Sequence, residues 1–346
     1  ETKDKRGVGN LLQRVWTSGT RHYHSKQIAY VLDSLGASVS AFVGRHTMGL
    51  SLEFLSKQWP SVKPILTDIL LNPAFPEDEF ETEKNILLQD IRSERDLPAQ
   101  VCQLNFMKAL YGDHPYGRSS LGTLETVSSL TTEDLKTFYK NYIHQSGVVV
   151  SSVGYFDKTK WETEISELIH QLPKGGIQTG RTQPISAAKE LSVVCETKQP
   201  LHQSQLLIGF LGPDIKNEDR FPLKLLHSCL AGQGGRLFLE LRDRQSLAYS
   251  VAPLQSDNPE SGMFGVYIGC SPEKLPVAIH GIRKELERVI ENPISQKELS
   301  RAKQYWLGRI ALDMQRFSSQ AMMFGLDEMY GLGFDFCSKI VKLFTR

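Results

Sequence analysis

The sequence predicts an α+β fold of two tandem related domains, each an antiparallel-rich sheet with helices packed on one face. Amphipathic helical segments are mixed with short apolar, β-branched segments, and the mixture repeats in a similar order in the second half. Between the halves, PKGGIQTGRTQPISAAKE (173–190) breaks all periodicity and is rich in Gly, Thr, Ser and Pro, which is typical of an interdomain linker. We therefore expect domains at 1–174 and 191–346, joined by a linker at 175–190.

The first half is predicted to begin with two helices. GVGNLLQRVWTS is amphipathic and ends at the breaker Gly19, and a second helix starts at Ser25 and is closed by Gly36. Two strands are expected within ASVSAFVG and HTMGLSLEFL, which are rich in β-branched and apolar residues. A further strand, expected to be buried, is VVVSSVG (148–154). The other expected helices lie at 59–71, 77–95, 98–111, 131–143 and 157–171.

The second half is predicted to run from a strand, QSQLLIGFLGP, into a helix at 219–231. A Gly-rich turn, GQGGRL (232–237), follows, and after it come another helix, strands at 248–256 and 261–270, and long helices at 274–292 and 295–316. GQGGRL lacks both the Lys-Ser/Thr of a P-loop and the G-x-G-x-x-G spacing, which argues against nucleotide binding. We expect it to be a tight turn between helices.

Composition excludes several classes of partner. Lys and Arg number 40 and Asp and Glu 39, a net charge of +1, so no basic surface for nucleic acid or anionic membrane is expected. No apolar run reaches the ~18 residues of a transmembrane helix, and no signal peptide is visible in the chain as given. We expect a soluble protein, in a compartment that the sequence leaves open. The five Cys are odd in number and form no C-x-x-C pair, which indicates free or buried thiols.

Three residues of the first helix have the spacing of a zinc-protease site but the wrong side chains. In an H-x-x-E-H motif, two His on one helical face hold Zn²⁺ and the Glu activates the bound water. Here Asn10, Gln13 and Arg14 stand in those places. Asn is a poor zinc ligand, Gln cannot act as a base, and Arg carries a fixed positive charge. We therefore expect no metal at this site, and His22 with His24 is only a weak i, i+2 signal.

The helix carrying Asn10 and its neighbours resembles that of the pitrilysin/insulinase family of inverted zinc peptidases, family M16. The resemblance covers nearly the whole chain and also rests on LGASVSA, HPYGRSSLGT, TTEDLKTFYKNYI, VVVSSVGYFD and GGRLFLELRDRQSLAYSV. In the family a carboxylate completes the metal site, with another Glu about two helical turns earlier. The matching residues are Asp90 and Glu83. Family members normally also have strands before the first helix, and a helix and a strand after the position where this chain stops, VKLFTR, so we expect trimmed termini.

Arg14 has a second role open to it, an ion pair with Asp90 or Glu83. These two carboxylates lie at i and i+7 of one predicted helix and so share a face. An ion pair would replace the metal by a salt bridge and keep the same contact between helices. A polar contact without any functional role is the alternative interpretation.

Arg242 and Tyr249, in ELRDRQSLAYSV, resemble the family's C-terminal Arg/Tyr pair, which binds substrate or the tetrahedral oxyanion. Losing the metal residues while keeping this pair predicts a non-catalytic subunit that donates both residues to an active H-x-x-E-H partner. That partner would be a related subunit that supplies zinc, and the substrate would be a peptide. A homodimer is the other assembly that we expect. The alternatives are a structural scaffold without peptidase role and a self-sufficient metallopeptidase with unusual ligands.

Overall fold

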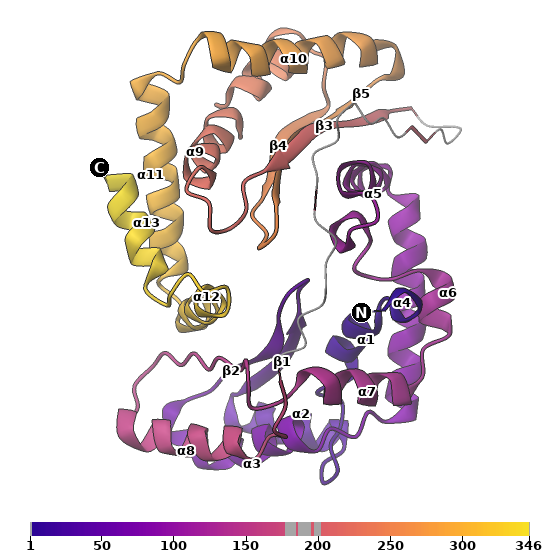
Figure 1. Cartoon of the computed structure of the whole chain (residues 1–346), viewed down its shortest axis with the longest axis vertical. Helices are drawn as coiled ribbons and strands as arrows, with labels where there is room; N and C mark the ends of the chain where they lie inside the picture. The colour runs from indigo at the N-terminus through magenta and orange to yellow at the C-terminus, as the bar shows by residue number, and fades with distance from the viewer. Residues whose placement is uncertain (1, 177–184, 186–194, 197–201, 346) are drawn as a thin grey trace. The chain divides into compact units, whose positions relative to one another are not determined.

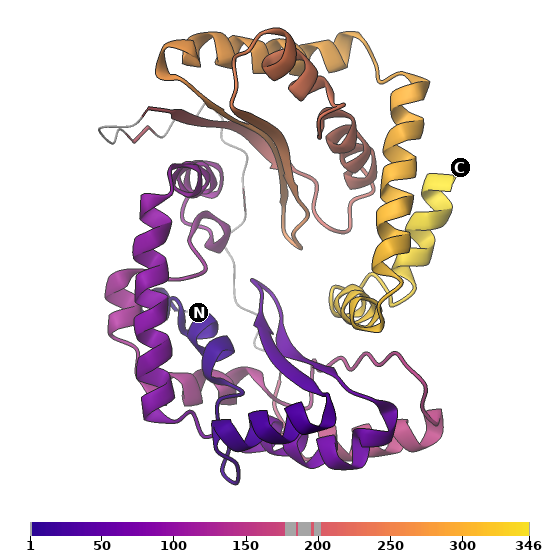
Figure 2. The same ribbon diagram turned by 180° about the vertical axis from the view of Figure 1, so that it is seen from behind.

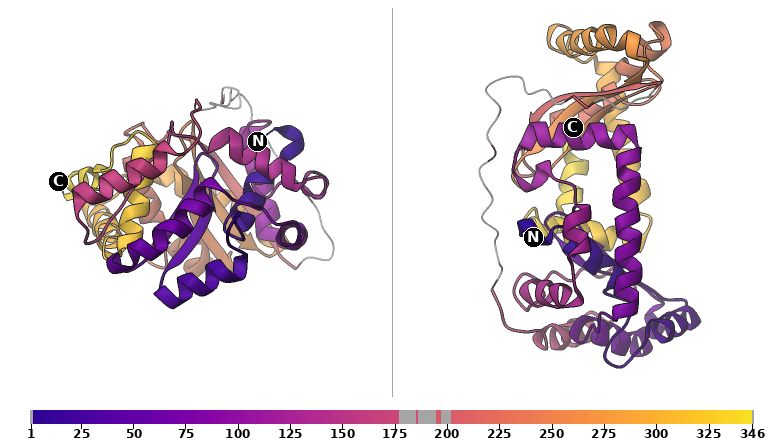
Figure 3. Two further views of the ribbon diagram at one scale, coloured as in Figure 1. Left: turned by 90° about the horizontal axis from the view of Figure 1, so that it is seen from below. Right: turned by 90° about the vertical axis from the view of Figure 1, so that its right-hand side faces the viewer.

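The computed structural model describes residues 2–176, 185, 195–196 and 202–345, so most of the expected linker at 175–190 lies outside the described residues. The chain forms two compact units, each assembled from segments that are separate in sequence (Figures 1 and 3). Unit 1 comprises residues 1–93, 119–181 and 313–337, and unit 2 comprises residues 94–118, 182–312 and 338–346. The expected domain boundaries at 174 and 191 remain a prediction.

Unit 1 contains a two-stranded antiparallel sheet and a set of helices (Figures 1 and 2). Strands β1 and β2 pair with Ala41 opposite Leu50. The elements of this unit are η1 (Lys3–Lys5), α1 (Val8–Val15), α2 (Ser25–Leu35), β1 (Ser38–Val43), β2 (Met48–Glu53), η2 (Ser56–Gln58), α3 (Trp59–Leu71), most of α4 (Glu77–Asp96), α6 (Leu124–Ser128), α7 (Thr132–Tyr142), α8 (Lys158–His170) and α12 (Phe317–Met329).

Helix α1 is held in the core of unit 1 by one apolar face. Val8, Leu11, Leu12 and Val15 are at most 2% exposed, and they pack in one cluster with residues of α3, α4 and α7. The chain enters the helix through Gly7, whose φ of 92° and lack of Cβ permit close packing against the Leu121 carbonyl. Because the apolar face is buried, the polar stripe of the same helix points away from this cluster.

Unit 2 is built on a three-stranded antiparallel sheet with the order β3-β5-β4. Figure 1 shows α9 and α10 beside this sheet, with α5 close to β3. The elements of this unit are α5 (Pro98–Tyr111), η3 (Pro115–Gly117), β3 (Ser204–Gly212), α9 (Arg220–Leu230), the π-helix η4 (Phe238–Arg244), β4 (Ser250–Ser256), β5 (Gly262–Cys270), η5 (Pro272–Lys274), α10 (Leu275–Glu291), α11 (Gln296–Asp313) and most of α13 (Phe336–Thr345).

The central strand β5 buries both of its faces. Phe264, Val266 and Ile268 alternate along the strand, are fully buried, and pack with residues of α9, η4 and α10. Met263, the residue before Phe264, faces the other way and packs with Tyr111 of α5. Alternation with a period of two places successive side chains on opposite faces of the sheet, so the helices cover β5 from both sides.

The α+β class with antiparallel sheets is confirmed, and most predicted elements match the structure within a few residues. The buried strand expected at 148–154 is wrong: no strand forms there, and Val148 and Val150 are 39% and 48% exposed. An extended segment becomes a strand only when a neighbouring strand takes its backbone hydrogen bonds. The helix expected after GQGGRL is a π-helix, and α12 and α13 were not predicted. Among the described residues, no helix is both long and apolar enough to cross a membrane.

Candidate functional site

The polar stripe of α1 carries Asn10, Gln13 and Arg14, and all three side chains are partly buried. Asn10 and Arg14 lie one turn apart and contact each other: Arg14 Nε donates to Asn10 Oδ1 at 3.1 Å. The spacing that would put two zinc ligands on one face of a helix therefore puts an amide and a guanidinium there instead.

Arg14 also joins α1 to α4. Its Nη2 donates to Asp90 Oδ2 at 2.6 Å, and its Nη1 lies 3.7 Å from Glu83 Oε2. The two carboxylates lie on the same face of α4, as their i, i+7 spacing predicted. The ion pair considered for Arg14 is thus confirmed, with Asp90 as the hydrogen-bonded partner and Glu83 as the more distant one.

Gln13 contacts a different element, strand β1. Its side-chain carbonyl Oε1 accepts a hydrogen bond from the backbone N–H of Val43 at 3.2 Å. Val43 is the last residue of β1, so Gln13 pairs a backbone donor at the strand end. This hydrogen bond links the end of β1 to α1.

These residues do not suit a zinc ion. A dication would have to displace the guanidinium of Arg14 from Asp90, and its would-be ligands Asn10 and Arg14 already bond to each other. In the described part of the chain, no group of three or more His, Cys, Asp or Glu side chains is arranged to hold a metal.

His22 has a partner other than a metal. Its Nδ1 lies 2.8 Å from Oδ1 of Asp68, a carboxylate that is 6% exposed and also accepts from Asn72 at 2.8 Å. Burial alone would raise the pKa of Asp68, but hydrogen bonds from Thr20, His22 and Asn72 lower it below its ordinary value. The arrangement anchors the turn that leads into α2.

Arg242 and Tyr249 lie on either side of a buried anchor in unit 2. The π-helix η4 ends at Arg244. Two residues later Ser246 has a φ of 49°, and Leu247 donates its N–H to the Leu241 carbonyl at 2.8 Å. Leu241 and Leu247 are buried, whereas Arg242 is exposed and Tyr249 is 59% exposed. Lys274 donates to the Ser246 carbonyl at 2.8 Å and so supports this corner.

The donor groups of Arg242 and Tyr249 are not used elsewhere in the described structure. Their side chains form no hydrogen bond or ion pair with any other described residue. The guanidinium of Arg242 lies over the ring of Phe238, 5.0 Å from its centroid. A guanidinium and a phenol with unused N–H and O–H groups can donate hydrogen bonds to a carboxylate or a developing oxyanion.

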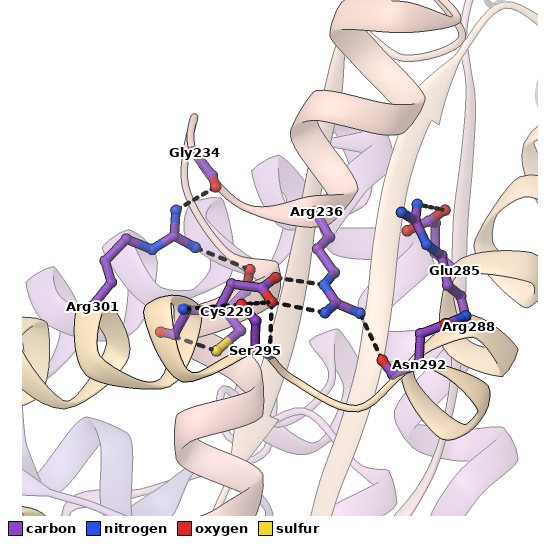
Figure 4. A network of polar contacts seen from close by, with 9 residues as sticks. Cys229, Gly234, Arg236, Glu285, Arg288, Asn292, Ser295 and Arg301 are labelled. Atoms are coloured by element: carbon purple, nitrogen blue, oxygen red, sulfur yellow. Dashed lines mark hydrogen bonds and ion pairs between the residues drawn. The ribbon is translucent and has the colours of Figure 1, made fainter.

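The GQGGRL segment forms the expected turn between two helices, α9 and η4. Gly232 has a φ of 73°, and a Cβ on Gly235 would lie 2.3 Å from the Ala231 carbonyl oxygen. Two arginines hold the segment, as Figure 4 shows: Arg236 makes a bidentate pair with Glu298 at 2.6 and 2.8 Å, and Arg301 donates to the Gly234 carbonyl. Hydrogen bonds from Arg236 and Ser295 lower the pKa of Glu298 to about 2, against the effect of burial.

Two contacts at the candidate sites escaped prediction from the sequence. The contact of Gln13 with Val43 depends on where β1 ends in space, and no local pattern signals it. The stacking of Arg242 on Phe238 has a signal, because an aromatic residue and an Arg at i and i+4 of a helix lie on the same face.

The chain is similar to proteins of a known peptidase family along nearly its whole length. The family model described as "Insulinase (Peptidase family M16)" matches residues 1–124, and the model "Peptidase M16 inactive domain" matches residues 129–305. The uncharacterized zinc protease YmxG of Bacillus subtilis is 27% identical over 330 residues, which are 95% of this chain and 80% of that protein. An uncharacterized zinc protease of Rickettsia felis is 27% identical over 305 residues, 88% of this chain and 73% of that protein.

Two crystal structures share the fold. A peptidase M16 inactive domain from Pseudomonas fluorescens aligns with a TM-score of 0.88 at 23% identity, covering 98% of this chain and 82% of that one. A protease from Helicobacter pylori aligns with a TM-score of 0.84 at 18% identity, covering 100% of this chain and 87% of that one.

Proposed function

The chain belongs to peptidase family M16, and from this premise we propose that it is the non-catalytic subunit of a two-chain zinc metallopeptidase. The partner is a related subunit with an intact H-x-x-E-H motif, which supplies the zinc and the general base. This chain donates Arg242 and Tyr249 to the partner's active site, and the complex hydrolyses peptides.

The observation that carries the proposal is the hydrogen bond from Arg14 to Asp90, at 2.6 Å. Both residues stand at positions that resemble the family's metal ligands, and here they form an ion pair instead. A permanent cation bonded to the carboxylate opposes a dication at the same place. The chain therefore preserves a contact between α1 and α4 without metal chemistry of its own.

The state of Arg242 and Tyr249 supports a role toward another molecule. A buried donor must be paired within the fold, because leaving it unpaired is costly, whereas an exposed donor remains available to another molecule. Arg242 and Tyr249 instead lie at exposed positions, while the backbone beside them is anchored by the buried Leu241 and Leu247. Exposed donors on an anchored backbone suit recognition of a substrate carbonyl or oxyanion.

Co-expression with an H-x-x-E-H family member from the same genome tests the proposal. We expect a complex on size-exclusion chromatography, zinc only in the partner, and peptide hydrolysis that requires both chains. A complex whose hydrolysis is unchanged by Arg242→Ala and Tyr249→Phe would identify this chain as a structural scaffold. Hydrolysis by the purified chain alone, abolished by a chelator, would identify a self-sufficient metallopeptidase.

A further inference from the structure

The guanidinium of Arg242 is held by an aromatic ring and not by a carboxylate. Its central carbon lies 5.0 Å from the centroid of the Phe238 ring, one turn earlier in η4. Phe238 is partly buried, whereas Arg242 is exposed. The ring is therefore the more fixed member of the pair, and it limits where an otherwise freely rotating side chain can lie.

Stacking and ion pairing leave an arginine in different chemical states. A carboxylate partner occupies the N–H edge of the guanidinium, which is the edge that recognises carbonyl and carboxylate oxygens. An aromatic partner occupies the flat face and leaves all the N–H donors at the edge available. The guanidinium of Arg242 lies over the Phe238 ring, and its N–H groups have no hydrogen-bond partner among the described residues.

Two acidic residues of η4 flank Arg242. Asp243 is its direct neighbour, and residues at i and i+1 of a helix do not face each other, while Glu240 is bonded to other residues. Both carboxylate oxygens of Glu240 are engaged: Arg244 Nη1 donates to Oε2 at 2.9 Å, and Gln245 Nε2 donates to Oε1 at 3.0 Å. The Gln245 backbone N–H also donates to the Glu240 carbonyl, an i to i+5 bond of the π-helix. The π-helical turn thus brings Gln245 within reach of Glu240.

We infer that Phe238 is a positioning residue for Arg242, and that it keeps the guanidinium oriented with its donor edge free for a substrate oxygen. The inference rests on the proposed function, in which the oriented guanidinium of Arg242 donates to a substrate oxygen in the partner's active site. Glu240 assists in a separate way: its carboxylate is satisfied by Arg244 and Gln245 and does not compete for Arg242.

The orientation can be measured on the isolated chain by NMR of ¹⁵Nε-labelled arginine, with the Arg242 signal assigned from the Arg242→Lys variant. We expect a ring-current shift of the Arg242 Nε–H signal that disappears in Phe238→Leu and is kept in Phe238→Tyr. The Arg244 signal should stay in place in Phe238→Leu, which shows that the π-helix is intact. An Arg242 signal at the free-arginine position in the unmodified chain would overturn the inference.

The contribution of this Arg242 orientation to catalysis can be measured by the turnover of the complex with the H-x-x-E-H partner. An exposed cation–π contact is worth enough to lower turnover about two- to fivefold in Phe238→Leu. Phe238→Tyr should restore the rate, and Phe238→Leu should have no further effect in an Arg242→Ala background. Equal losses in both backgrounds, or no loss where Arg242→Ala is damaging, would overturn the positioning role. If Arg242→Ala itself is harmless, the proposed function fails, and the positioning role fails with it.

Discussion

Arg14 of α1 donates a 2.6 Å hydrogen bond to Asp90 of α4, across 76 positions of sequence. Arg14 reaches Glu83 less closely, at 3.7 Å, so one guanidinium faces two carboxylates. In a zinc peptidase of this family, a metal ion joins the corresponding helices. In this chain the Arg14 side chain links the polar faces of α1 and α4, beside the apolar cluster that both helices share.

Arg14→Ala should lower the free energy of unfolding by about 1 kcal/mol, since it removes a partly exposed ion pair and leaves two carboxylates without their cation. Chemical denaturation at low ionic strength measures the effect, and added salt should reduce it. The matched control is Arg92→Ala on α4, the helix that carries the partners of Arg14; the exposed side chain of Arg92 has no described partner. Equal midpoints for the two variants would mean that the Arg14 ion pair does not stabilise the fold.

The isolated chain, prepared with zinc present, should contain no stoichiometric zinc by elemental analysis, because Arg14 opposes a dication beside Asp90. Asn10→His alone should not change this. The combination of Asn10→His, Gln13→Glu, Arg14→His and Asp90→Glu should restore zinc binding. Its Gln13→Glu component keeps an oxygen that can accept from Val43 N–H, so β1 should remain attached.

Two results would contradict this account of the lost site. One is about one tightly bound zinc per chain in the unmodified protein. The other is zinc binding by the Asn10→His variant, which would mean that the Arg14–Asp90 ion pair opens easily. The variant with Asn10→His, Gln13→Glu and Asp90→Glu but with Arg14 kept is the matched control, and it should bind no zinc.

Helix α1 shows how much of the fold was predictable from the sequence. Its buried face of Val8, Leu11, Leu12 and Val15 has the period of an amphipathic helix, and the helix lies where this pattern predicted it. Helix α12 shows where such prediction fails. None of its residues is fully buried, so the helix has no buried apolar face that a periodic sequence pattern would predict. The error at 148–154 has another source, because apolar β-branched composition does not reveal whether a partner strand lies alongside.

The candidate sites were predictable to different degrees. The i, i+4 spacing puts Asn10 and Arg14 on one face, and the i, i+7 spacing does the same for Glu83 and Asp90. That these two faces meet depends on tertiary packing, and only the resemblance to family M16 indicated it. The π-helical form of η4 could not be predicted, since it shifts backbone hydrogen bonds by one residue without a distinctive side-chain pattern.

The Arg236–Glu298 ion pair joins the GQGGRL segment to α11, and its contribution to the stability of the fold should depend on pH. The pKa of Glu298 is about 2 in the folded state against an ordinary 4.5, so the folded state favours the ionised form. This contribution to stability is fully present above about pH 4.5 and is lost as the pH falls toward 2. Glu298→Gln should therefore cost about 1.5–3 kcal/mol of unfolding free energy near pH 7, the range for hydrogen bonds to a charged group.

The measurement is chemical denaturation of both proteins near pH 7 and near pH 3. The difference in unfolding free energy between wild type and Glu298→Gln should be smaller at the lower pH, because the Glu298 carboxylate of the unfolded wild type is largely protonated there. Glu287→Gln, an exposed acid on α10 without a described partner, is the matched control and should have no effect at either pH. A constant difference across this range would show that the effect of Glu298→Gln does not come from its charge.

The partner role that we propose for this chain would depend on two donors, and Tyr249 allows the cleaner test. Tyr249→Phe removes one hydroxyl and little volume, and Tyr249 is 59% exposed, so folding and assembly should be unaffected. If the phenol donates to the developing oxyanion, kcat of the complex should fall roughly 10²–10³-fold with KM little changed. If it binds only the ground-state substrate, KM should rise instead. Arg242→Ala should be similarly damaging.

The matched control is Tyr155→Phe, which alters a tyrosine of unit 1 that is 92% exposed and should leave both constants unchanged. Because the complex is checked by size-exclusion chromatography in every case, unaltered kinetics in both Tyr249→Phe and Arg242→Ala would exclude donation in trans.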